Sequence, residues 1–463
     1  MKKKILLNSF LILVWNFGNA QTMETLQYNG DINKYINIVI LGDGYTSSQQ
    51  SDFISDATNL TNYLFTQSPW SNYKNYFNVF AIEVISNESG AKHLGTTSEC
   101  GTIPISNPST YFGSEFDYNG MHRLVVPTNT TNIVNVLSTI FPYYDQVLMI
   151  VNTPHYGGSG GGIATSTNHS SSNEITAHEL GHSFAGLADE YYAGDTYAGE
   201  KPNMTQQTNA ALVKWENWMG INGIGIYQHC CGGQSASWYR PQNNCKMQNF
   251  GVSYCNVCTE AIIEKIHSLV NIIVSYTPTT MTITSPNQYI DFNLSDLMKP
   301  IPNTLNIEWK LDGVQILNNV DSIQIDQNNL EIGMHTLTAT VEDNSSLINV
   351  NNHYQIHFCT ITWTIIKTTL GVQLMSNDNK ISISAFPNPT NSILNISIES
   401  DKPQKASMYI ISFDGRKSFQ LENEIVVNGK YLNTYNVEHL STGFYTIVFK
   451  IGDVTQTQKF IKQ

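Results

Sequence analysis

The chain has 463 residues and a formal net charge of -13, with 13% charged and 41% hydrophobic residues. This length exceeds what a single hydrophobic core fills, so we expect more than one domain, and the composition excludes a disordered or fibrous chain. Nucleic acids and anionic membranes bind basic patches, and the acidic balance of this chain therefore argues against such partners. We expect no nucleic-acid partner.

The first twenty residues have the pattern of a secretory signal peptide. Residues 2–4 are lysines, residues 5–14 are mostly apolar, and Gly18-Asn19-Ala20 provides a small-x-small cleavage site. The apolar run is shorter than the roughly 20 residues that a bilayer span requires, and no later segment is apolar enough to span. We expect residues 1–20 to be removed from an exported protein that has no transmembrane segment.

Residues 21–275 are expected to alternate strands with helices. A buried strand over Tyr35–Leu41 precedes a helix whose apolar positions recur at helical spacing, namely Phe53, Ala57, Leu60 and Leu64. β-branched and aromatic residues predict further strands over Tyr76–Ile85, Leu124–Val126 and Gln146–Val151. The glycine-rich stretch 157–162 is too flexible for a strand interior and is expected to form a loop beside the functional site. This alternation indicates a mixed α/β fold.

Beyond Ser275 the sequence consists of short alternating segments separated by Asn, Pro and Gly, which is typical of a β-sandwich. Trp309 and Trp363 are expected in its core. The predicted strands are Met281–Ile283, Leu305–Leu311, Ser322–Ile325, His335–Val341 and Thr360–Ile365. A polar stretch at 376–379 marks a second boundary, after which another small β domain runs to the end. The expected divisions are 1–20, 21–275, 276–375 and 376–463.

The segment 176–191 contains the motif His-Glu-x-x-His. Ser171 and Glu174 have capping-box spacing, so a helix that starts there carries His178 and His182 one turn apart on one face. Two imidazoles in that relation can bind one zinc ion, and Glu179 can then contact a metal-bound water as general base. The motif predicts a zinc-dependent hydrolase.

A third zinc ligand is expected close downstream, where Asp189 and Glu190 form a carboxylate pair. Gly186 followed by Asp189 has the glycine-x-x-ligand form found in metzincins, although one residue later than their usual spacing, and we favour Asp189 over Glu190. The other carboxylate could orient a ligand imidazole instead. Met247 is a candidate for an apolar floor beneath the metal, with ordinary core packing as the alternative.

Five of the seven cysteines lie within residues 230–258. In an exported protein such a cluster favours disulfide bonds, and the odd total leaves at least one thiol outside them. Cys245 and the pair Cys255-x-x-Cys258, with the vicinal Cys230 and Cys231, could instead bind a structural zinc ion, but the loose spacing favours disulfides.

The part of the chain that contains the His-Glu-x-x-His motif resembles the IgA-peptidase family of zinc metallopeptidases. The resemblance extends over about residues 32–274 and rests on four blocks, at Asn37–Thr46, Tyr156–Gly160, His178–Tyr191 and Cys245–Glu260. It implies a zinc-dependent endopeptidase with a metzincin-like fold. It does not imply immunoglobulin A as the substrate.

The C-terminal region resembles the sorting domain of the type IX secretion pathway. The motifs that carry the resemblance are Phe386–Pro389, Leu394–Ile396, Leu440–Tyr445 and Lys459–Gln463. This resemblance covers about the last 85 residues. It implies export through the type IX machinery across the outer membrane of a Gram-negative bacterium, with the product secreted or held at the cell surface.

These expectations describe an α/β (α+β) metzincin-like zinc peptidase domain followed by two all-β immunoglobulin-like sandwich domains. The expected activity is hydrolysis of peptide bonds in extracellular proteins, with zinc held by His178, His182 and Asp189 and with Glu179 as general base. A rival interpretation is a non-catalytic surface adhesin or glycan-binding protein on a peptidase scaffold. A third is a zinc hydrolase that acts on a non-peptide amide.

Overall fold

The structure is a computed structural model that describes residues 21–97, 103–230, 232–368, 381–412, 418–452 and 454–463. It divides into two compact units, residues 1–369 and 370–463. The expected signal peptide and the polar stretch at 376–379 lie outside the described residues. No helix among the described residues is long and apolar enough to cross a membrane. The boundary near residue 275 stays a prediction.

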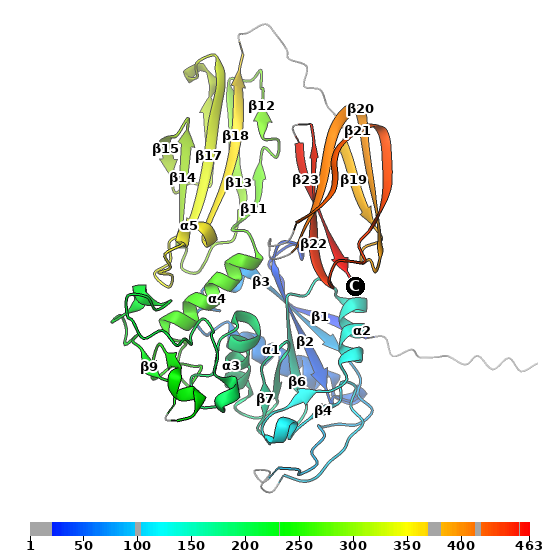
Figure 1. The fold of residues 1–463 in the computed structure, drawn as a ribbon, viewed down its shortest axis with the longest axis vertical. Helices are drawn as coiled ribbons and strands as arrows, with labels where there is room; N and C mark the ends of the chain where they lie inside the picture. Colours follow the sequence, from blue (N-terminus) through cyan, green and yellow to red (C-terminus); the bar gives the residue numbers. More distant parts are fainter. Residues whose placement is uncertain (1–20, 98–102, 231, 369–380, 413–417, 453) are drawn as a thin grey trace, which may run out of the picture. The chain divides into compact units, whose positions relative to one another are not determined.

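A six-stranded sheet forms the centre of the N-terminal half of the first unit (Figure 1). Its order is β1-β3-β2-β6-β8-β7, with β2, β3, β6 and β8 parallel and with antiparallel strands β1 and β7 at the edges. The strands are β1 Thr22–Gln27, β2 Ile36–Asp43, β3 Phe77–Glu83, β6 Gln146–Val151, β7 Gly158–Ser159 and β8 Ala164–Thr167. Every residue of β2 and β6 is buried, as expected for parallel strands covered on both faces.

Helices cover both faces of this sheet and bury separate cores. They are α1 Gln50–Leu64, α2 Thr130–Ile140, α3 Ser172–Ala185 and α4 Asn256–Leu269. Ile38 and Ile40 of β2 pack in one core with apolar residues of α1, α3 and α4. Val39 and Leu41 point to the other face and pack in a core with residues of α2. The alternation along β2 therefore joins the two helical layers.

Short elements complete this region. They are the strand pairs β4 Ser114–Glu115 with β5 Val126–Pro127 and β9 Tyr227–Gln228 with β10 Tyr239–Arg240. The 3-10 turns along the first unit are η1 Ser47–Gln49, η2 Lys74–Tyr76, η3 Tyr118–Gly120, η4 Asp195–Tyr197, η5 Glu216–Trp218, η6 Gln234–Ser237 and η7 Gln327–Asn329.

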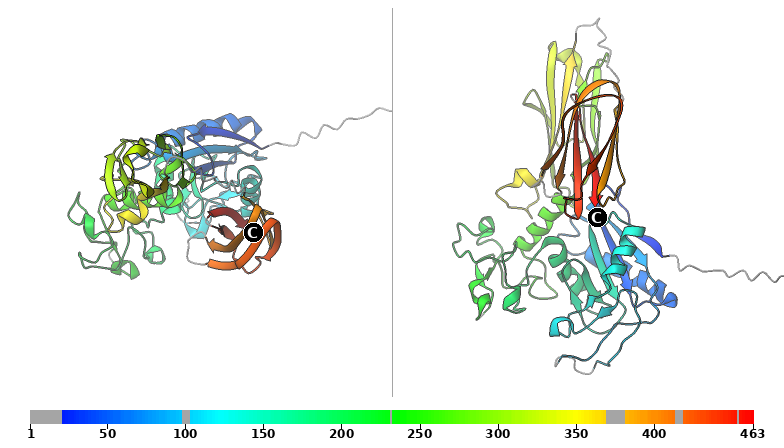
Figure 2. Two further views of the ribbon diagram at one scale, coloured as in Figure 1. Left: turned by 90° about the horizontal axis from the view of Figure 1, so that it is seen from above. Right: turned by 45° about the vertical axis from the view of Figure 1, so that its right-hand side comes forward.

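Residues 273–367 form two β-sheets around their own core, and the left-hand view of Figure 2 shows them from above. The smaller sheet has the order β11 Ile273–Thr277, β13 Tyr289–Leu297, β16 Ser322–Asp326. The larger has the order β12 Thr282–Ile283, β18 Phe358–Lys367, β17 Gly333–Asp343, β14 Leu305–Leu311, β15 Val314–Asn318, and a short helix α5 His353–Ile356 precedes β18. Trp309 and Trp363 are fully buried, and their rings stack with their centroids 5.9 Å apart. Both residues therefore lie in the core, as expected.

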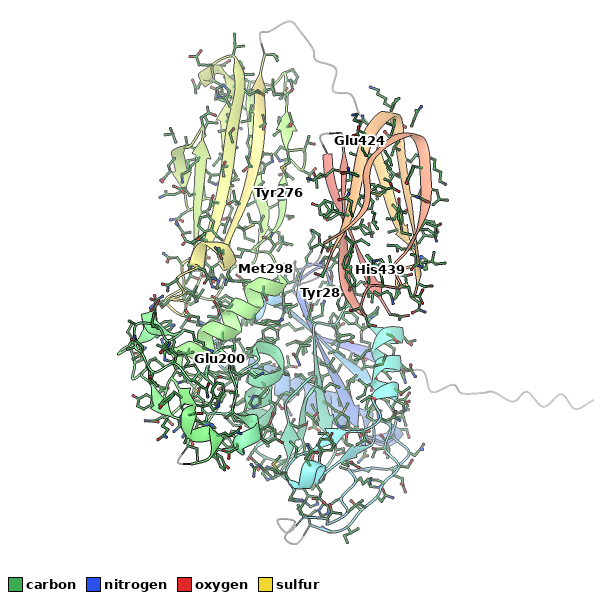
Figure 3. All side chains as sticks on the ribbon, viewed as in Figure 1. Tyr28, Glu200, Tyr276, Met298, Glu424 and His439 are labelled. Carbon is green, nitrogen blue, oxygen red and sulfur yellow. The ribbon has the colours of Figure 1, made fainter. Side chains whose placement is uncertain are left out.

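Buried polar contacts join these sheets to the helical region within the first unit. The Tyr73 hydroxyl donates to Asp343 Oδ2 at 2.5 Å, and the Tyr76 hydroxyl donates to the carbonyl of Met298, which lies beside the end of α4 (Figure 3). Because these groups are buried, loss of one partner leaves the other unsatisfied.

The second unit is a five-stranded antiparallel sheet structure with its own core. Its strands are β19 Ile381–Phe386, β20 Ile393–Ser412, β21 Ser418–Asn436, β22 Gly443–Ile451 and β23 Val454–Lys462. The order is β19-β20-β22-β23, and β21 also pairs with β20. The chain is therefore mixed α/β with mostly strands, which is the coarse fold that the sequence predicts.

Three local expectations were wrong. The Leu124–Val126 segment contributes only Val126 to a strand, and Leu124 forms an isolated bridge with Gly158. Gly158 and Ser159 are not simple loop residues but form β7 against β8. The capping box at Ser171 is absent: α3 begins there without a side-chain cap, because Glu174 accepts hydrogen bonds from Lys246 Nζ, Gly251 N and Tyr63 instead.

Candidate metal centre and active site

Helix α3 carries the His-Glu-x-x-His motif against the central sheet. Its buried face consists of Ile175, Ala177, Leu180 and Phe184, and Thr176 donates a hydrogen bond to Ser166 of β8 at 2.7 Å. Gly186 ends the helix with a left-handed φ of 66°, a conformation that glycine adopts without strain. The turn sends the chain back along the helix toward its two histidines.

The Nδ1 atoms of both histidines face backbone carbonyl oxygens. His178 Nδ1 lies 2.9 Å from the carbonyl oxygen of Lys246, and His182 Nδ1 lies 2.7 Å from that of Leu187. A carbonyl oxygen only accepts, so Nδ1 of each ring carries the proton and donates it. In the neutral rings both Nε2 atoms are therefore lone-pair donors available to a metal.

The two Nε2 atoms meet the Asp189 carboxylate at one point. Asp189 Oδ1 lies 3.0 Å from His178 Nε2 and 3.1 Å from His182 Nε2, and the two nitrogens are 3.1 Å apart. Three electron-pair donors this close repel one another unless a proton or a cation lies among them. Two imidazole nitrogens and one carboxylate oxygen are a donor set that suits zinc and that leaves a fourth position for water or substrate.

Charge coupling inside this group perturbs its acids and bases. Burial opposes ionisation of Asp189, but hydrogen bonds from His178 and His182 outweigh it and lower the pKa of that carboxyl. Burial also opposes protonation of His182, yet the hydrogen bond and charge of Asp189 raise its pKa to about 9. Both shifts have the same cause, which is that a positive charge beside the Asp189 carboxylate is favourable.

Glu190, the alternative third ligand, lies elsewhere. Its side chain is fully buried, accepts a hydrogen bond from Asn203 Nδ2 at 3.0 Å, and approaches Cys258 rather than either histidine. The structure therefore brings together His178, His182 and Asp189 and separates them from Glu190.

Glu179 lines a cavity of about 670 Å³ together with the three grouped residues. Burial raises the pKa of the Glu179 carboxyl, while the charges of His178 and His182 oppose this. The glycine stretch forms the opposite wall: a Cβ atom on Gly160 would lie 2.8 Å from Glu179 Oε2 and 2.8 Å from His182 Cβ. Only glycine allows the backbone directly after β7 to approach these side chains so closely.

Met247 packs directly beneath α3. It is fully buried, and a Cβ atom on Gly181 would lie 2.5 Å from its sulfur. Gly181 lies between the two histidines in the sequence, so Met247 supports the part of the helix that carries them. This contact agrees with an apolar floor and, equally, with core packing, because Met247 belongs to the large core of the first unit.

Tyr254 and Tyr191 both lie near the site but have different positions. The Tyr254 hydroxyl donates to the carbonyl of Ala177 in α3, and this residue does not line the cavity. Tyr191 does line it, with its ring 6.0 Å from that of His178. Burial raises the pKa of Tyr191, although Arg123, another residue of the cavity wall, opposes this. The sequence offered no signal for Arg123, which belongs to no motif.

The disulfide expectation is not confirmed. Cys100 and Cys231 lie outside the described residues, and Cys245, Cys255, Cys258 and Cys359 form no disulfide bond. The sulfur atoms of Cys245 and Cys258 are 3.6 Å apart, well beyond the S–S bond length of about 2.05 Å.

A further group was not foreseen from the sequence. His122 Nδ1 lies 2.9 Å from Asp117 Oδ1, and His93 Nε2 lies 3.8 Å from Asp117 Oδ2. One ligand-type atom of each of these three residues lies within 4.8 Å of those of the other two, which is close enough for all three to bind one metal ion. They come from separate loop segments without motif spacing, so only the tertiary structure brings them together.

Family comparisons agree with both resemblances seen in the sequence. Residues 25–224 match the family described as IgA Peptidase M64, and residues 384–463 match the Secretion system C-terminal sorting domain. The peptidase match ends before Cys245, so it is shorter than the resemblance over residues 32–274. No curated protein matches the chain.

Among solved structures, dimeric latent PorU from Porphyromonas gingivalis is 16% identical over 41% of this chain and 20% of that chain, with a TM-score of 0.17. The fibronectin(III)-like modules of CbhA from Clostridium thermocellum are 11% identical over 41% of this chain and 94% of theirs, with a TM-score of 0.15. The chain thus spans a fifth of the length of PorU.

The two family matches cover separate parts of the chain and are consistent with each other, since a sorting domain delivers the region that precedes it. The expected localisation is thereby confirmed. The chain is similar to the IgA Peptidase M64 family over residues 25–224 and to the Secretion system C-terminal sorting domain over residues 384–463, and the sorting domain indicates a secreted or cell-surface protein of a Gram-negative bacterium.

Proposed function

We propose that the chain is a secreted zinc-dependent endopeptidase that cleaves extracellular proteins, with His178, His182 and Asp189 as zinc ligands. The observation that carries the proposal is the convergence of His178 Nε2, His182 Nε2 and Asp189 Oδ1 within 3.1 Å of one another. The protonated Nδ1 atoms, held by backbone carbonyls, present both Nε2 lone pairs to the same point. The match to the peptidase family supports the assignment of peptidase activity.

We propose a metzincin-like fold for residues 21–275, and the arrangement around α3 supports it. One helix presents both histidines, a left-handed glycine ends it, a carboxylate follows three residues later, and a methionine packs beneath the helix. When bound, zinc supplies Lewis-acid polarisation of a peptide carbonyl and activation of water for attack.

Glu179 is the proposed general base. Its carboxylate faces the same cavity as the ligand atoms, so it can accept the proton of the attacking water and then donate it to the leaving amine nitrogen. Burial favours the protonated state that this second transfer requires. Tyr191 and Arg123, which line the cavity, are placed to bind the substrate carbonyl or backbone near the reacting bond.

The remaining expectations fit this proposal. The substrate is a protein or peptide outside the cell, because the sorting domain directs the chain to the type IX machinery and to the exterior. We also propose that residues 276–375 form an immunoglobulin-like domain, on the basis of the two sheets and shared core of residues 273–367.

The test compares the wild-type chain with a Glu179→Gln variant in zinc content and in cleavage of denatured casein. We expect the variant to keep its zinc and to lose at least about 100-fold in activity, the low end of what general acid–base catalysis contributes. Glu200→Gln, which changes an exposed carboxylate that does not line the cavity, is the matched control and is expected to keep full activity. Full activity of Glu179→Gln contradicts the general-base role of Glu179. No chelator-sensitive cleavage by the wild type contradicts the peptidase and favours the adhesin.

A further inference from the structure

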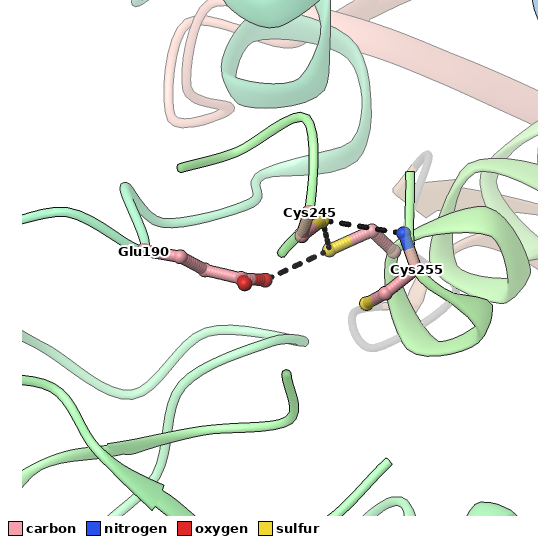
Figure 4. A group of neighbouring side chains, drawn as sticks. Glu190, Cys245 and Cys255 are labelled. Atoms are coloured by element: carbon pink, nitrogen blue, oxygen red, sulfur yellow. Dashed lines mark hydrogen bonds between the residues drawn. The ribbon is translucent and has the colours of Figure 1, made fainter. Parts of the chain in front are cut away.

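Four ligand-type side chains converge in the interior behind the zinc-ligand group. Glu190 follows α3, Cys245 lies in the segment that leads to Met247, and Cys255 and Cys258 lie at the start of α4. Glu190, Cys245 and Cys258 are completely buried, and Cys255 is 4% exposed. Their carboxylate and sulfur atoms all lie within 4.8 Å of one another, and Figure 4 shows Glu190, Cys245 and Cys255 converging.

The distances in this group suit ligands of one metal ion. The sulfur atoms of Cys245 and Cys258 are 3.6 Å apart, and Cys258 Sγ lies 3.2 Å from Glu190 Oε1. Thiolates bound tetrahedrally to zinc at about 2.3 Å are separated by roughly 3.8 Å, and a carboxylate oxygen at about 2.0 Å lies closer. The observed separations are near these values and far from those of a covalent S–S bond.

One atom of the group lacks a partner. Glu190 Oε1 accepts from Asn203, whereas Glu190 Oε2 is buried and has no hydrogen-bond partner. A carboxylate oxygen that is buried without a partner is strongly unfavourable, and a bound cation removes this penalty. The orphaned oxygen is thus a second observation, independent of the cysteines, that points to a ligand.

A backbone group also points at one sulfur of the group. The amide of Cys255 donates to Cys245 Sγ at 3.2 Å. This hydrogen bond orients the Cys245 sulfur toward the start of α4, where Cys255 and Cys258 lie.

We propose that Glu190, Cys245, Cys255 and Cys258 bind a structural zinc ion, separate from the group of His178, His182 and Asp189. This ion ties together three segments that shape the active site. The amide of Glu190 donates to the carbonyl of Met247 at 2.7 Å, and the neighbouring carbonyl of Lys246 accepts from His178. The structural zinc therefore holds the Asp189 segment and the Met247 segment in register beneath α3.

A disulfide bond explains the group less well. Three thiols allow only one disulfide among them, which leaves a third buried thiol beside a buried carboxylate without a cation. A metal ion uses all four side chains. The odd number of thiols and the orphaned Glu190 oxygen are thus accounted for together by zinc.

The test measures zinc content and zinc X-ray absorption on the full-length chain and on a His178→Ala/His182→Ala double variant. We expect two zinc ions per wild-type chain and one in the double variant, whose remaining ion has about three sulfur neighbours at about 2.3 Å. Alkylation of the denatured, chelated chain under non-reducing conditions is expected to modify Cys245, Cys255 and Cys258 in full.

This design separates the inference from the proposed activity. One zinc with sulfur neighbours in both proteins supports the structural site and contradicts the zinc peptidase. No zinc in the double variant, or a pair among the three cysteines that resists alkylation without reductant, overturns the structural site.

Cysteine variants provide a second readout. Cys258→Ser is expected to lose the sulfur-bound zinc and to lower the thermal midpoint, whereas Cys359→Ser, a matched control outside the group, retains both ions. If Cys258→Ser does not fold, the absorption spectrum of the double variant still decides, because it leaves all the cysteines intact. Cys258→Ser with an unchanged sulfur-bound zinc contradicts the ligand assignment.

Discussion

Asp189 and Glu190 are consecutive residues whose carboxylates reach two different groups. Asp189 Oδ1 lies 3.0 Å from His178 Nε2, and Glu190 Oε1 lies 3.2 Å from Cys258 Sγ. The backbone between them is held by hydrogen bonds from the Glu190 amide to Met247 and from the Ala188 amide to Asn203. These hydrogen bonds fix the backbone of the segment, so the two neighbouring side chains are directed toward different partners.

Asp189→Asn is expected to weaken zinc binding at the histidine group by more than the roughly 10- to 100-fold that loss of an outer partner costs. The change keeps the size of the side chain and removes the anionic ligand. Zinc affinity is measured by competition with a chromophoric chelator. Asp195→Asn, on the same loop but outside the cavity, is the control and is expected to bind zinc as the wild type does. Equal affinities for both variants would exclude Asp189 as a ligand.

Gly160→Ala is expected to reduce kcat/KM by about 100-fold while the protein still folds, because the new methyl group displaces Glu179 and His182 from their positions. Gly162→Ala is a matched control in the same stretch, where a Cβ atom meets nothing within 4 Å. Peptidase assays and circular dichroism of the two variants provide the comparison. Equal activity of the two alanine variants would show that the close approach of this strand is unimportant.

Gly181→Ala is expected to destabilise the protein by about 1–3 kcal/mol through overpacking against the sulfur of Met247. Met247→Ala alone creates a cavity and costs about 2–5 kcal/mol. In the double variant the added methyl group occupies part of that cavity, so the double change costs less than the two single changes together. Denaturant unfolding of the four proteins measures this coupling, and simple additivity would argue against direct packing.

Two buried histidines make stability depend on pH. His267 Nδ1 lies 2.6 Å from His357 Nδ1, and His267 Nε2 lies 3.5 Å from Asp343 Oδ2. Burial, together with the charge of His353, lowers the pKa of His267 to about 3, and burial with the charges of His267 and His353 lowers that of His357 to about 3 despite Asp343. Both rings are thus neutral in the folded protein at neutral pH.

The unfolded chain binds protons at these histidines below about pH 6.5, and the folded chain does so only near pH 3. Stability is therefore fully present above pH 6.5 and falls as the pH drops toward 3, by up to about 1.4 kcal/mol per histidine for each pH unit. Thermal midpoints measured across this range are expected to vary less in His267→Gln. The exposed His439→Gln serves as control, and an unchanged pH dependence in His267→Gln would contradict this assignment.

Local pattern was sufficient for elements whose periodicity is strong. The four apolar residues at helical spacing, Phe53, Ala57, Leu60 and Leu64, are the buried face of α1. The predicted strand Gln146–Val151 matches β6 in full, because a strand buried on both faces consists almost entirely of apolar residues. Helix α2, with Ile133, Val136 and Leu137 buried, was not predicted, since its short apolar stripe is interrupted by threonine and asparagine.

The sequence alone determined which residues of the motif share a helix face, because the spacing of His178 and His182 and the helical repeat leave little choice. It could not assign Asp189 and Glu190, since consecutive side chains separate only when the turn after Gly186 and the partners on each side are in place. The spacing of the cysteines in the sequence favoured disulfide bonds over a structural zinc site. Only the tertiary structure brings Cys245, Cys255 and Cys258 around a buried carboxylate, because packing between distant segments, not local spacing, creates that site.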